Sequence, residues 1–259
     1  LDRQSIILAL ESAVAKNVEG IVICFLHAYK NAEHELAAKT IVQELAPHLP
    51  VVCSSEIWPV IREYERTVTT VLNGYIQPRV AAYLSAFEDA LKQKGVPARP
   101  LVTKTNGGVM AVEEGKVSSV NLVLSGTASG VMGAAFVASL SDVKNAITLD
   151  IGGTSADVAL VIDGQPQYGM GEKIGDFPLY VPSVSVASIG EGGGSIAWTD
   201  EFGVLKVGPE SAGSEPGPAC YGRGGTRPAV TDADLVLGRI DPDNFAGGAI
   251  RLSSAAARD

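Results

Sequence analysis

The sequence predicts an α/β fold, and two stretches of the chain carry that prediction. Residues 2–54 alternate helix and strand patterns: a helical period from Asp2 to Asn17, an apolar run from Val18 to Leu26, a second helix capped by Asn31, and a short strand from Val51 to Ser54. This order is typical of a βαβ unit with parallel strands. Residues 146–163 read instead as a strand, a tight glycine turn and a second strand returning beside the first.

Composition argues against two classes of protein. The 259 residues carry a formal net charge of −9 and no Lys/Arg cluster, so we expect no nucleic-acid partner. There is no run of about 18 apolar residues, so we expect no membrane-spanning segment.

The cysteines and the chain ends indicate where the chain comes from. Cys24, Cys53 and Cys220 lie far apart without metal-ligand spacing, which is typical of a protein in the reducing cytoplasm. The chain does not start with methionine and ends without a closing element, so we expect a piece of a longer protein.

Between these two stretches the pattern is mainly helical. Apolar residues from Ile61 to Leu91 recur in steps of three and four, which predicts one long helix or two in series, with a kink or break at Pro78. Val120 to Leu124 is expected to be a strand that leads into a helix ending near Leu140. A further strand, Leu101 to Thr103, runs into a Thr-Asn-Gly-Gly loop.

That loop contains Asn106, Gly107 and Gly108, and two interpretations of it remain open. Asn-Gly is the usual signal for a tight hairpin turn. A loop at the carboxyl end of a strand is also where α/β sheets place their ligands, so the same residues are candidates for substrate binding.

The second stretch is richest in residues that could carry chemistry. Gly152 and Gly153 allow a sharp turn whose backbone N–H groups face phosphate oxygens without a Cβ in the way. Asp150 could hold a magnesium ion beside those phosphates, while Thr154 and Ser155 add hydroxyl groups. An ordinary hairpin whose Asp and Thr cap the turn explains the same residue types, and the two interpretations stay open on composition alone.

The order of these residues resembles a known element. A strand ending in D-x-G-G-T, followed by x-x-D-V and another apolar strand, is similar to the phosphate-binding hairpin of the actin, sugar-kinase and heat-shock-chaperone ATPases. Other nucleotide signatures do not fit: Gly115-Lys116 lacks P-loop spacing. The Gly190 to Ser195 cluster lacks the helix that should follow a Rossmann turn.

Several segments together resemble one family. TNGGVM, LSGTASGVMGA, DIGGTSADVALV, SIGEGGGSIAW, VGPESAGSEPGPACYGRGG and VTDADLVLGRI follow one another as in the hydantoinase A / 5-oxoprolinase family. The resemblance implies an actin-like ATPase (ribonuclease H-like) fold. Residues 1–143 would be the C-terminal part of the first lobe, and residues 144–259 the start of the second lobe with its Gly/Pro-rich loops.

The same resemblance implies the site residues. Asp150 and Asp157 are the expected catalytic carboxylates, and Asp150 the metal ligand. The expected cofactor-binding residues are Asp150, Gly152, Gly153, Thr154, Ser155, Gly192, Gly193, Gly194 and Ser195. ATP and Mg2+ are the implied cofactors.

The implied function is ATP-dependent hydrolysis of a cyclic amide, a hydantoin, N-methylhydantoin or 5-oxoproline ring, with a second hydantoinase B-type subunit. An ATP-dependent ketone carboxylase subunit and a non-catalytic assembly subunit are the alternatives. Thr127 and Glu191 depart from the usual family residues, and residues 185–187 replace an Asp-x-His, so the substrate is expected to differ from that of many members. Cys220 is expected to be a packed, reduced thiol.

Overall fold

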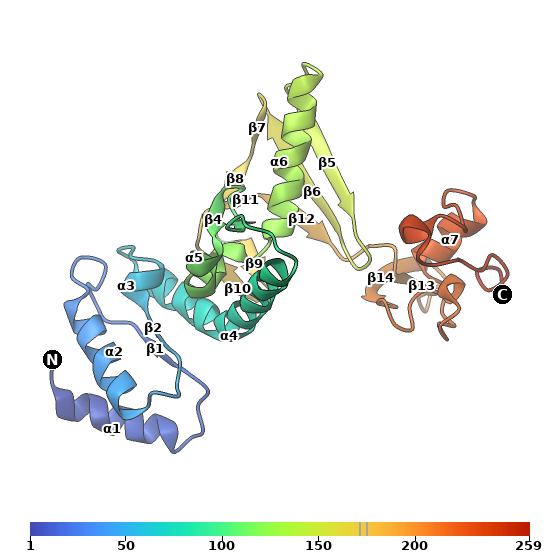
Figure 1. The fold of residues 1–259 in the computed structure, drawn as a ribbon. Coiled ribbons are helices and arrows are strands. Elements are labelled where there is room, and N and C mark those ends of the chain that lie inside the picture. Colours follow the sequence, from blue (N-terminus) through green and yellow to red (C-terminus); the bar gives the residue numbers. More distant parts are fainter. Residues whose placement is uncertain (171, 175) are drawn as a thin grey trace. The chain divides into compact units, whose positions relative to one another are not determined.

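Contacts between residues divide the chain into two units. A computed structural model describes residues 1–170, 172–174 and 176–259 (Figure 1). The first unit holds Leu1–Gly133 and Gln167–Ser185, and the second holds Ala134–Pro166 and Val186–Asp259. The division into lobes at residue 143 stays a prediction. No described helix is long and apolar enough to cross a membrane.

The first unit opens with the predicted βαβ motif. It comprises α1 (Arg3–Val14), β1 (Ile21–Ile23), α2 (Glu33–Leu45) and β2 (Val51–Cys53). The strands pair in parallel, with Ile21 opposite Val51. Asp2 caps α1 as expected, because its carboxylate accepts from the N–H groups of Gln4 and Ser5. The helix α2 begins one residue later than predicted, with Ala32 at its cap position, but the Asn31 side-chain oxygen still accepts from the Glu33 N–H at 2.9 Å.

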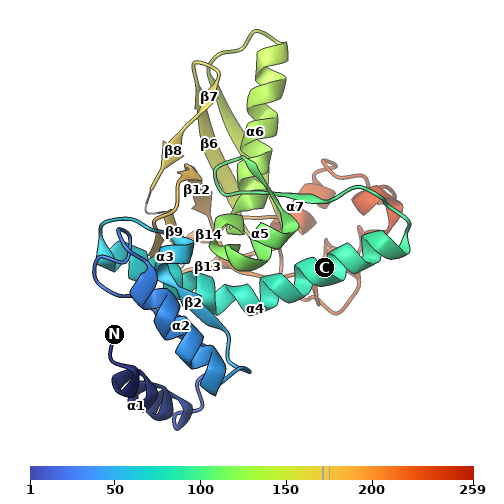
Figure 2. The same cartoon turned by 60° about the vertical axis from the view of Figure 1, so that its left-hand side comes forward.

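The rest of the first unit is built on one long helix (Figure 2). Its elements are α3 (Ser54–Ile57), α4 (Glu63–Gln93), β3 (Leu101–Thr103), β4 (Val109–Ala111), α5 (Val112–Val117), η1 (Ser119–Leu122), the start of α6 (Ser125–Leu140), β8 (Tyr168–Gly169), β9 (Glu172–Ile174), β10 (Phe177–Leu179) and β11 (Ser183–Val184). The helix α4 continues through Pro78, which confirms the alternative of one long helix and shows that the expected break at Pro78 was wrong. Proline removes only one helical hydrogen bond, and Asn73 and Leu84 are buried on either side of it.

A second expectation that fails is the strand at Val120 to Leu124. The residues there form the 3-10 helix η1. The N–H of Val120 donates to the side-chain oxygen of Asn73 at 2.9 Å, and the carbonyl of Asn121 accepts from Thr105 at 2.7 Å. These contacts take up backbone groups that a strand would have placed in a ladder.

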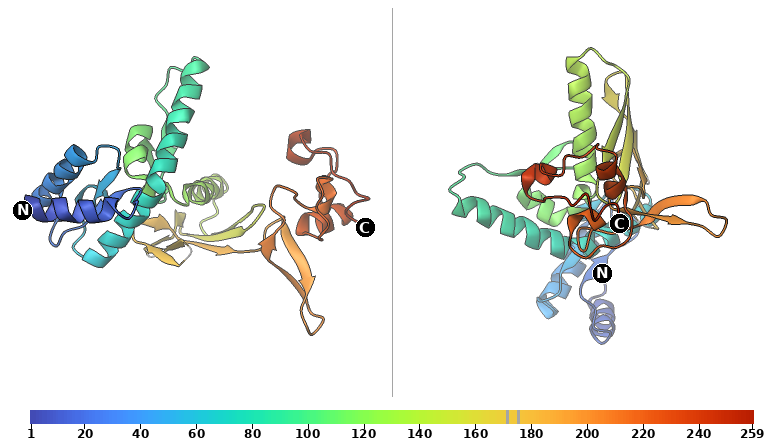
Figure 3. Two further views of the ribbon diagram at one scale, coloured as in Figure 1. Left: turned by 90° about the horizontal axis from the view of Figure 1, so that it is seen from below. Right: turned by 90° about the vertical axis from the view of Figure 1, so that its right-hand side faces the viewer.

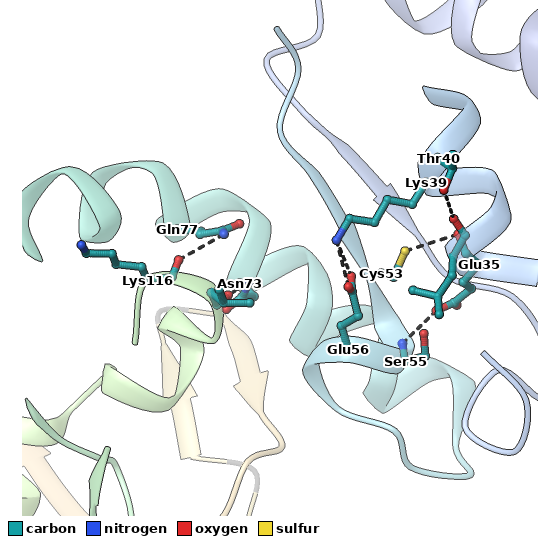
Figure 4. Close-up of polar contacts among 11 residues, drawn as sticks. Glu35, Lys39, Thr40, Cys53, Ser55, Glu56, Asn73, Gln77 and Lys116 are labelled. Atoms are coloured by element: carbon teal, nitrogen blue, oxygen red, sulfur yellow. Dashed lines mark hydrogen bonds and ion pairs between the residues drawn. The ribbon is translucent and has the colours of Figure 1, made fainter. Parts of the chain in front are cut away.

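Polar side chains tie the helices of the first unit together (Figure 4). Glu35 on α2 is fully buried, and its carboxylate accepts from the N–H of Phe25 and from Ser54 and Ser55 at 2.7–2.8 Å. Burial acts to raise the pKa of Glu35, but these hydrogen bonds outweigh it and lower the pKa below its ordinary value. On α4, Asn73 donates to the Val117 carbonyl at 3.0 Å, which fastens α5 to the long helix.

The second unit contains the predicted hairpin. β5 (Ala146–Ile151) and β6 (Ala156–Ile162) pair antiparallel, with Asp150 opposite Asp157. The sheet has the order β12-β6-β5, in which β12 is Val186–Ile189, and β7 (Gln165–Pro166) also pairs with β6. The Asp163-Gly164 turn between β6 and β7 is confirmed by positive φ at both residues.

The remaining elements of the second unit follow a glycine-rich loop. They are β13 (Ser195–Thr199), β14 (Leu205–Ser211), η2 (Ala219–Tyr221), α7 (Val230–Val236) and η3 (Phe245–Gly248). Figure 3 shows β13 and β14, in orange, as a two-stranded ribbon, and α7 in red. Ile196 of β13 forms a bridge with Ala229, so the residue before α7 is joined to the strand that follows the glycine loop.

Candidate active site

The turn between β5 and β6, residues 152–155, is the centre of the candidate site. The strands pair up to Ile151 and Ala156, and the N–H of Gly152 donates to the Ser155 carbonyl at 2.8 Å. Four residues therefore make the whole turn. Within the described part of the chain, the backbone N–H groups of Gly153, Thr154 and Ser155 donate to no protein acceptor.

A second segment, residues 190–195, lies directly against this turn and is called the glycine loop here. The N–H of Gly193 donates to the Gly152 carbonyl at 2.8 Å, and the N–H of Gly194 donates to the Gly153 carbonyl at 2.6 Å. A Cβ on Gly192 would lie 2.6 Å from the Thr154 nitrogen and 2.7 Å from the Gly152 oxygen. The approach of the two backbones is possible only because residue 192 is glycine.

These two hydrogen bonds orient the turn. In a trans peptide unit the C=O and the following N–H point in opposite directions. Since the Gly152 and Gly153 carbonyls face the glycine loop, the N–H groups of Gly153 and Thr154 face away from it. Successive backbone N–H groups on one side of a turn form an anion-binding concavity. The arrangement is suited to holding phosphate oxygens.

Two carboxylates stand beside the turn on one face of the hairpin. Asp150 and Asp157 are directly opposite each other across β5 and β6, so their Cβ atoms are about 5 Å apart. Asp150 is exposed and Asp157 is half-buried with interactions of its own. Like charges in this position repel each other, and a cation between or beside them would offset that repulsion. No group of three or more His, Cys, Asp or Glu among the described residues is arranged to hold a metal ion.

The predicted cofactor residues thus come together in the second unit, but with different environments. In the glycine loop the N–H of Gly192 donates to the Ser195 hydroxyl at 2.8 Å, and the N–H of Ser195 donates to the Gly192 carbonyl at 2.9 Å. With the bonds of Gly193 and Gly194, all four N–H groups of residues 192–195 are taken up inside the protein. The loop holds the turn in shape, whereas the free N–H groups belong to residues 153–155.

The predicted substrate residues lie in the first unit. Asn106, Gly107 and Gly108 form the turn of the β3–β4 hairpin, with φ +77° at Gly107. The Asn106 side chain accepts from the Gly108 N–H at 3.0 Å, and the Lys104 N–H donates to the Gly108 carbonyl at 2.8 Å. The loop therefore has the hairpin geometry that Asn-Gly predicts, and its role in substrate binding stays a prediction.

Sequence reasoning missed the start of α7 as part of this site. Asp232 is 3% exposed, and its carboxylate accepts from three N–H groups: Ala219 at 3.2 Å, Cys220 at 2.7 Å and Ala229 at 2.9 Å. It thereby joins the helix to the Gly/Pro-rich segment before it. The signal was present in the sequence, because an Asp in the first turn of a helix is a usual partner for free N–H groups.

Cys220 is not a candidate nucleophile. Its side chain is fully buried, and its thiol is free. Burial, with the neighbouring Asp232 carboxylate, raises the pKa of the Cys220 thiol to about 12. A thiol of this kind stays protonated at neutral pH, which confirms the expectation of a packed, reduced side chain.

Comparisons with known proteins identify the family of this chain. The family model described as hydantoinase/oxoprolinase matches residues 66–259, and the model of the hydantoinase/oxoprolinase N-terminal region matches residues 1–46. The chain is 37% identical to caprolactamase subunit alpha of Pseudomonas jessenii over 259 residues, covering 100% of this chain and 37% of that protein. It is 38% identical to the acetophenone carboxylase gamma subunit of Aromatoleum aromaticum, covering 99% of this chain and 36% of that protein.

Solved structures give the same result. The nucleotide-free structure of acetone carboxylase, an enzyme of ATP-dependent acetone carboxylation, matches with a TM-score of 0.85 at 33% identity. The crystal structure of ATP-dependent caprolactamase from Pseudomonas jessenii matches with a TM-score of 0.76 at 36% identity. Each match covers 99% of this chain and 37% of the other, so the chain spans little more than a third of these relatives. The likeness confirms the predicted fold class, α/β of the actin-like ATPase type, and the chain belongs to the hydantoinase/oxoprolinase family.

Proposed function

We propose that the full-length protein is an ATP-dependent hydrolase that opens the C–N bond of a cyclic amide. The observation that carries the proposal is the turn at residues 152–155, which has three free N–H groups, two of them (Gly153 and Thr154) oriented by the glycine loop. A preformed set of backbone donors costs no rearrangement when an anion binds, which is what phosphoryl transfer requires of a site.

The residues of the second unit take different roles in this proposal. The N–H groups of Gly153, Thr154 and Ser155 bind phosphate oxygens, and Gly152 gives the turn its shape. Asp150 holds Mg2+ or its bound waters, with Asp157 beside it, because Mg2+ prefers oxygen ligands and keeps several waters. ATP, when bound, supplies a phosphoryl group that makes the amide carbon of the substrate more electrophilic. Gly192 to Ser195 support the turn and do not contact the nucleotide.

The hydrolase assignment is supported by the family description and by caprolactamase, whose name denotes action on a lactam, a cyclic amide. Caprolactamase subunit alpha and the acetophenone carboxylase gamma subunit are named as subunits. We therefore propose that this protein also works with a second, hydantoinase B-type subunit, and in the cytoplasm. Asn106, Gly107 and Gly108 remain candidates for substrate contact.

A second candidate function is ATP-dependent carboxylation of a ketone. It is favoured by one observation: the TM-score to acetone carboxylase is 0.85, against 0.76 for caprolactamase. The proposed ATP site would be the same in both functions, so the hairpin does not distinguish them. A non-catalytic assembly subunit is the third candidate, and it predicts that ATP is not consumed.

Calorimetry with Mg-ATP on the full-length protein tests the site. We expect saturable binding by the wild type and at least about tenfold weaker binding by Asp150→Ala, a loss of about 1.4 kcal/mol. If the wild type does not bind Mg-ATP, the proposed function is wrong. ATP consumption is then measured with hydantoin, 5-oxoproline, caprolactam, or acetone with bicarbonate. Acceleration by a cyclic amide supports the hydrolase, acceleration by acetone with bicarbonate supports the carboxylase, and acceleration by none supports the assembly subunit.

A further inference from the structure

We propose that Thr231 is a positioning residue for phosphate binding, acting on the 152–155 turn through the glycine loop; this rests on the proposed function. Thr231 is the second residue of α7 and is 5% exposed. Both of its donors reach one acceptor: its N–H lies 2.8 Å and its hydroxyl 2.7 Å from the carbonyl oxygen of Gly193. Two donors converging on one oxygen hold that peptide unit in a single orientation.

The effect of this contact reaches the turn through planar peptide units. Fixing the Gly193 carbonyl also fixes the N–H of Gly194, since the two belong to one peptide plane. That N–H donates to the Gly153 carbonyl at 2.6 Å. The Gly153 carbonyl in turn shares a plane with the N–H of Thr154, one of the free donors of the turn. We call this chain of groups, from the Thr231 hydroxyl to the Thr154 N–H, the Thr231 relay.

The relay orients and also polarises the final donor. Hydrogen bonds linked in series strengthen one another, because each carbonyl that accepts a hydrogen bond makes the N–H of its own peptide unit a better donor. The hydrogen bond from the Thr231 hydroxyl therefore strengthens the hydrogen bond that the Thr154 N–H donates to a bound anion. Its removal should weaken phosphate binding at a position that it does not touch.

Two neighbouring features show that the relay is closely fitted. A Cβ on Gly193 would lie 2.9 Å from the Thr231 hydroxyl oxygen, so a side chain at residue 193 would displace that hydroxyl. On the other side, Asp232 anchors the same helical turn through its three backbone hydrogen bonds. The backbone that carries Thr231 is therefore fixed beside the Gly193 carbonyl.

The test compares Thr231→Val, which keeps the shape and the backbone N–H but removes the hydroxyl, with Thr231→Ser, which keeps the hydroxyl. Mg-ATP binding to the full-length protein is measured by calorimetry. The loss of one hydrogen bond in the relay should raise the Kd of Thr231→Val about five- to tenfold with unchanged stoichiometry. The Ser variant should stay within about twofold of the wild type.

Stoichiometry separates positioning from structural damage, because a partly unfolded sample binds fewer equivalents at an unchanged Kd. Thr70→Val is the matched control: Thr70 is fully buried in the first unit and donates to the Arg66 carbonyl at 2.6 Å. Its Kd should equal that of the wild type. An unchanged Kd in Thr231→Val, or equal weakening in the Ser or Thr70 variants, overturns the inference while the proposed function stands. Absence of Mg-ATP binding by the wild type overturns the proposed function, and the inference with it.

Discussion

The N–H of Gly193 donates to the carbonyl oxygen of Gly152 at 2.8 Å, although the two residues are 41 positions apart in sequence. This bond and its neighbour from Gly194 to Gly153 turn the carbonyls of the hairpin toward the glycine loop and leave the N–H groups on the other side. A glycine cluster that the sequence predicts to bind the cofactor thus supports the turn that we propose to bind phosphate. The N–H groups of Gly193 and Gly194 bond to the hairpin backbone and those of Gly192 and Ser195 bond within the loop, so none of these four is available to a ligand.

Gly192→Ala should destabilise the protein and weaken its binding of Mg-ATP. The new methyl group would lie 2.6 Å from the Thr154 nitrogen and must push the loop and the turn apart. Forced packing of this kind costs about 1–3 kcal/mol, to be measured as the free energy of unfolding in urea. Gly126→Ala is the control, because a Cβ at residue 126 meets nothing within 4 Å and alanine favours a helix. Equal stability of the two variants would show that the loop does not press against the turn.

Asp150→Asn should weaken the binding of Mg-ATP without lowering the stability of the unliganded protein. Without ligand, the variant should be as stable as the wild type or more stable by a few tenths of a kcal/mol, because Asp150 no longer opposes the charge of Asp157. With Mg-ATP present, the increase in Tm expected for the wild type should be largely lost, since the proposed metal ligand is gone. Thermal unfolding with and without Mg-ATP measures both effects. A variant whose Tm rises with Mg-ATP as much as that of the wild type would remove Asp150 from the metal site.

Sequence patterns predicted local features of this fold well. The helix capped by Asp2 and the hairpin around Gly152 depend on residues within a few positions of one another, and each strand of the β1–β2 pair is marked by its own apolar run. Caps, strand periodicity and glycine turns are signals of this local kind. They also found the residues of the candidate phosphate turn.

The failures share a different cause, which is contact between residues far apart in the chain. Val120 looks like a strand residue, but Asn73 on α4 takes its N–H. Nor did any pattern indicate that Gly193 and Gly194 bond to the hairpin backbone or that Thr231 bonds to Gly193. Such partners are chosen by tertiary packing, which overrides local propensity. No spacing rule in one sequence connects residues 152, 193 and 231.

Asp232→Asn should lower stability far more than the same change two residues later. The Asp232 carboxylate accepts three backbone hydrogen bonds while nearly fully buried, and an amide offers one oxygen and an unwanted NH2 group in place of two oxygens. We expect a loss of about 2–3 kcal/mol in the free energy of unfolding. Asp234→Asn removes only a surface ion pair with Arg239 and should cost less than about 1 kcal/mol. Similar losses in both variants would mean that Asp232 does not anchor the segment.

The buried thiol of Cys220 should make the protein less stable in strong base. Burial and Asp232 raise its pKa to about 12 in the folded state, from an ordinary value of 9.0. The Cys220 thiol therefore makes its full contribution to the free energy of unfolding below pH 9, where it is protonated in both the folded and the unfolded protein. This contribution is lost as the pH rises toward 12, because only the thiol of the unfolded chain ionises, at about 1.4 kcal/mol per pH unit.

The test compares the wild type with Cys220→Ala. Cys53 has a similarly raised pKa, so Cys220→Ala should remove only part of the fall in the free energy of unfolding with pH. The check is the free energy of unfolding from pH 8 to 11 for both proteins. Parallel curves would show that Cys220 is not shielded from water in the folded state.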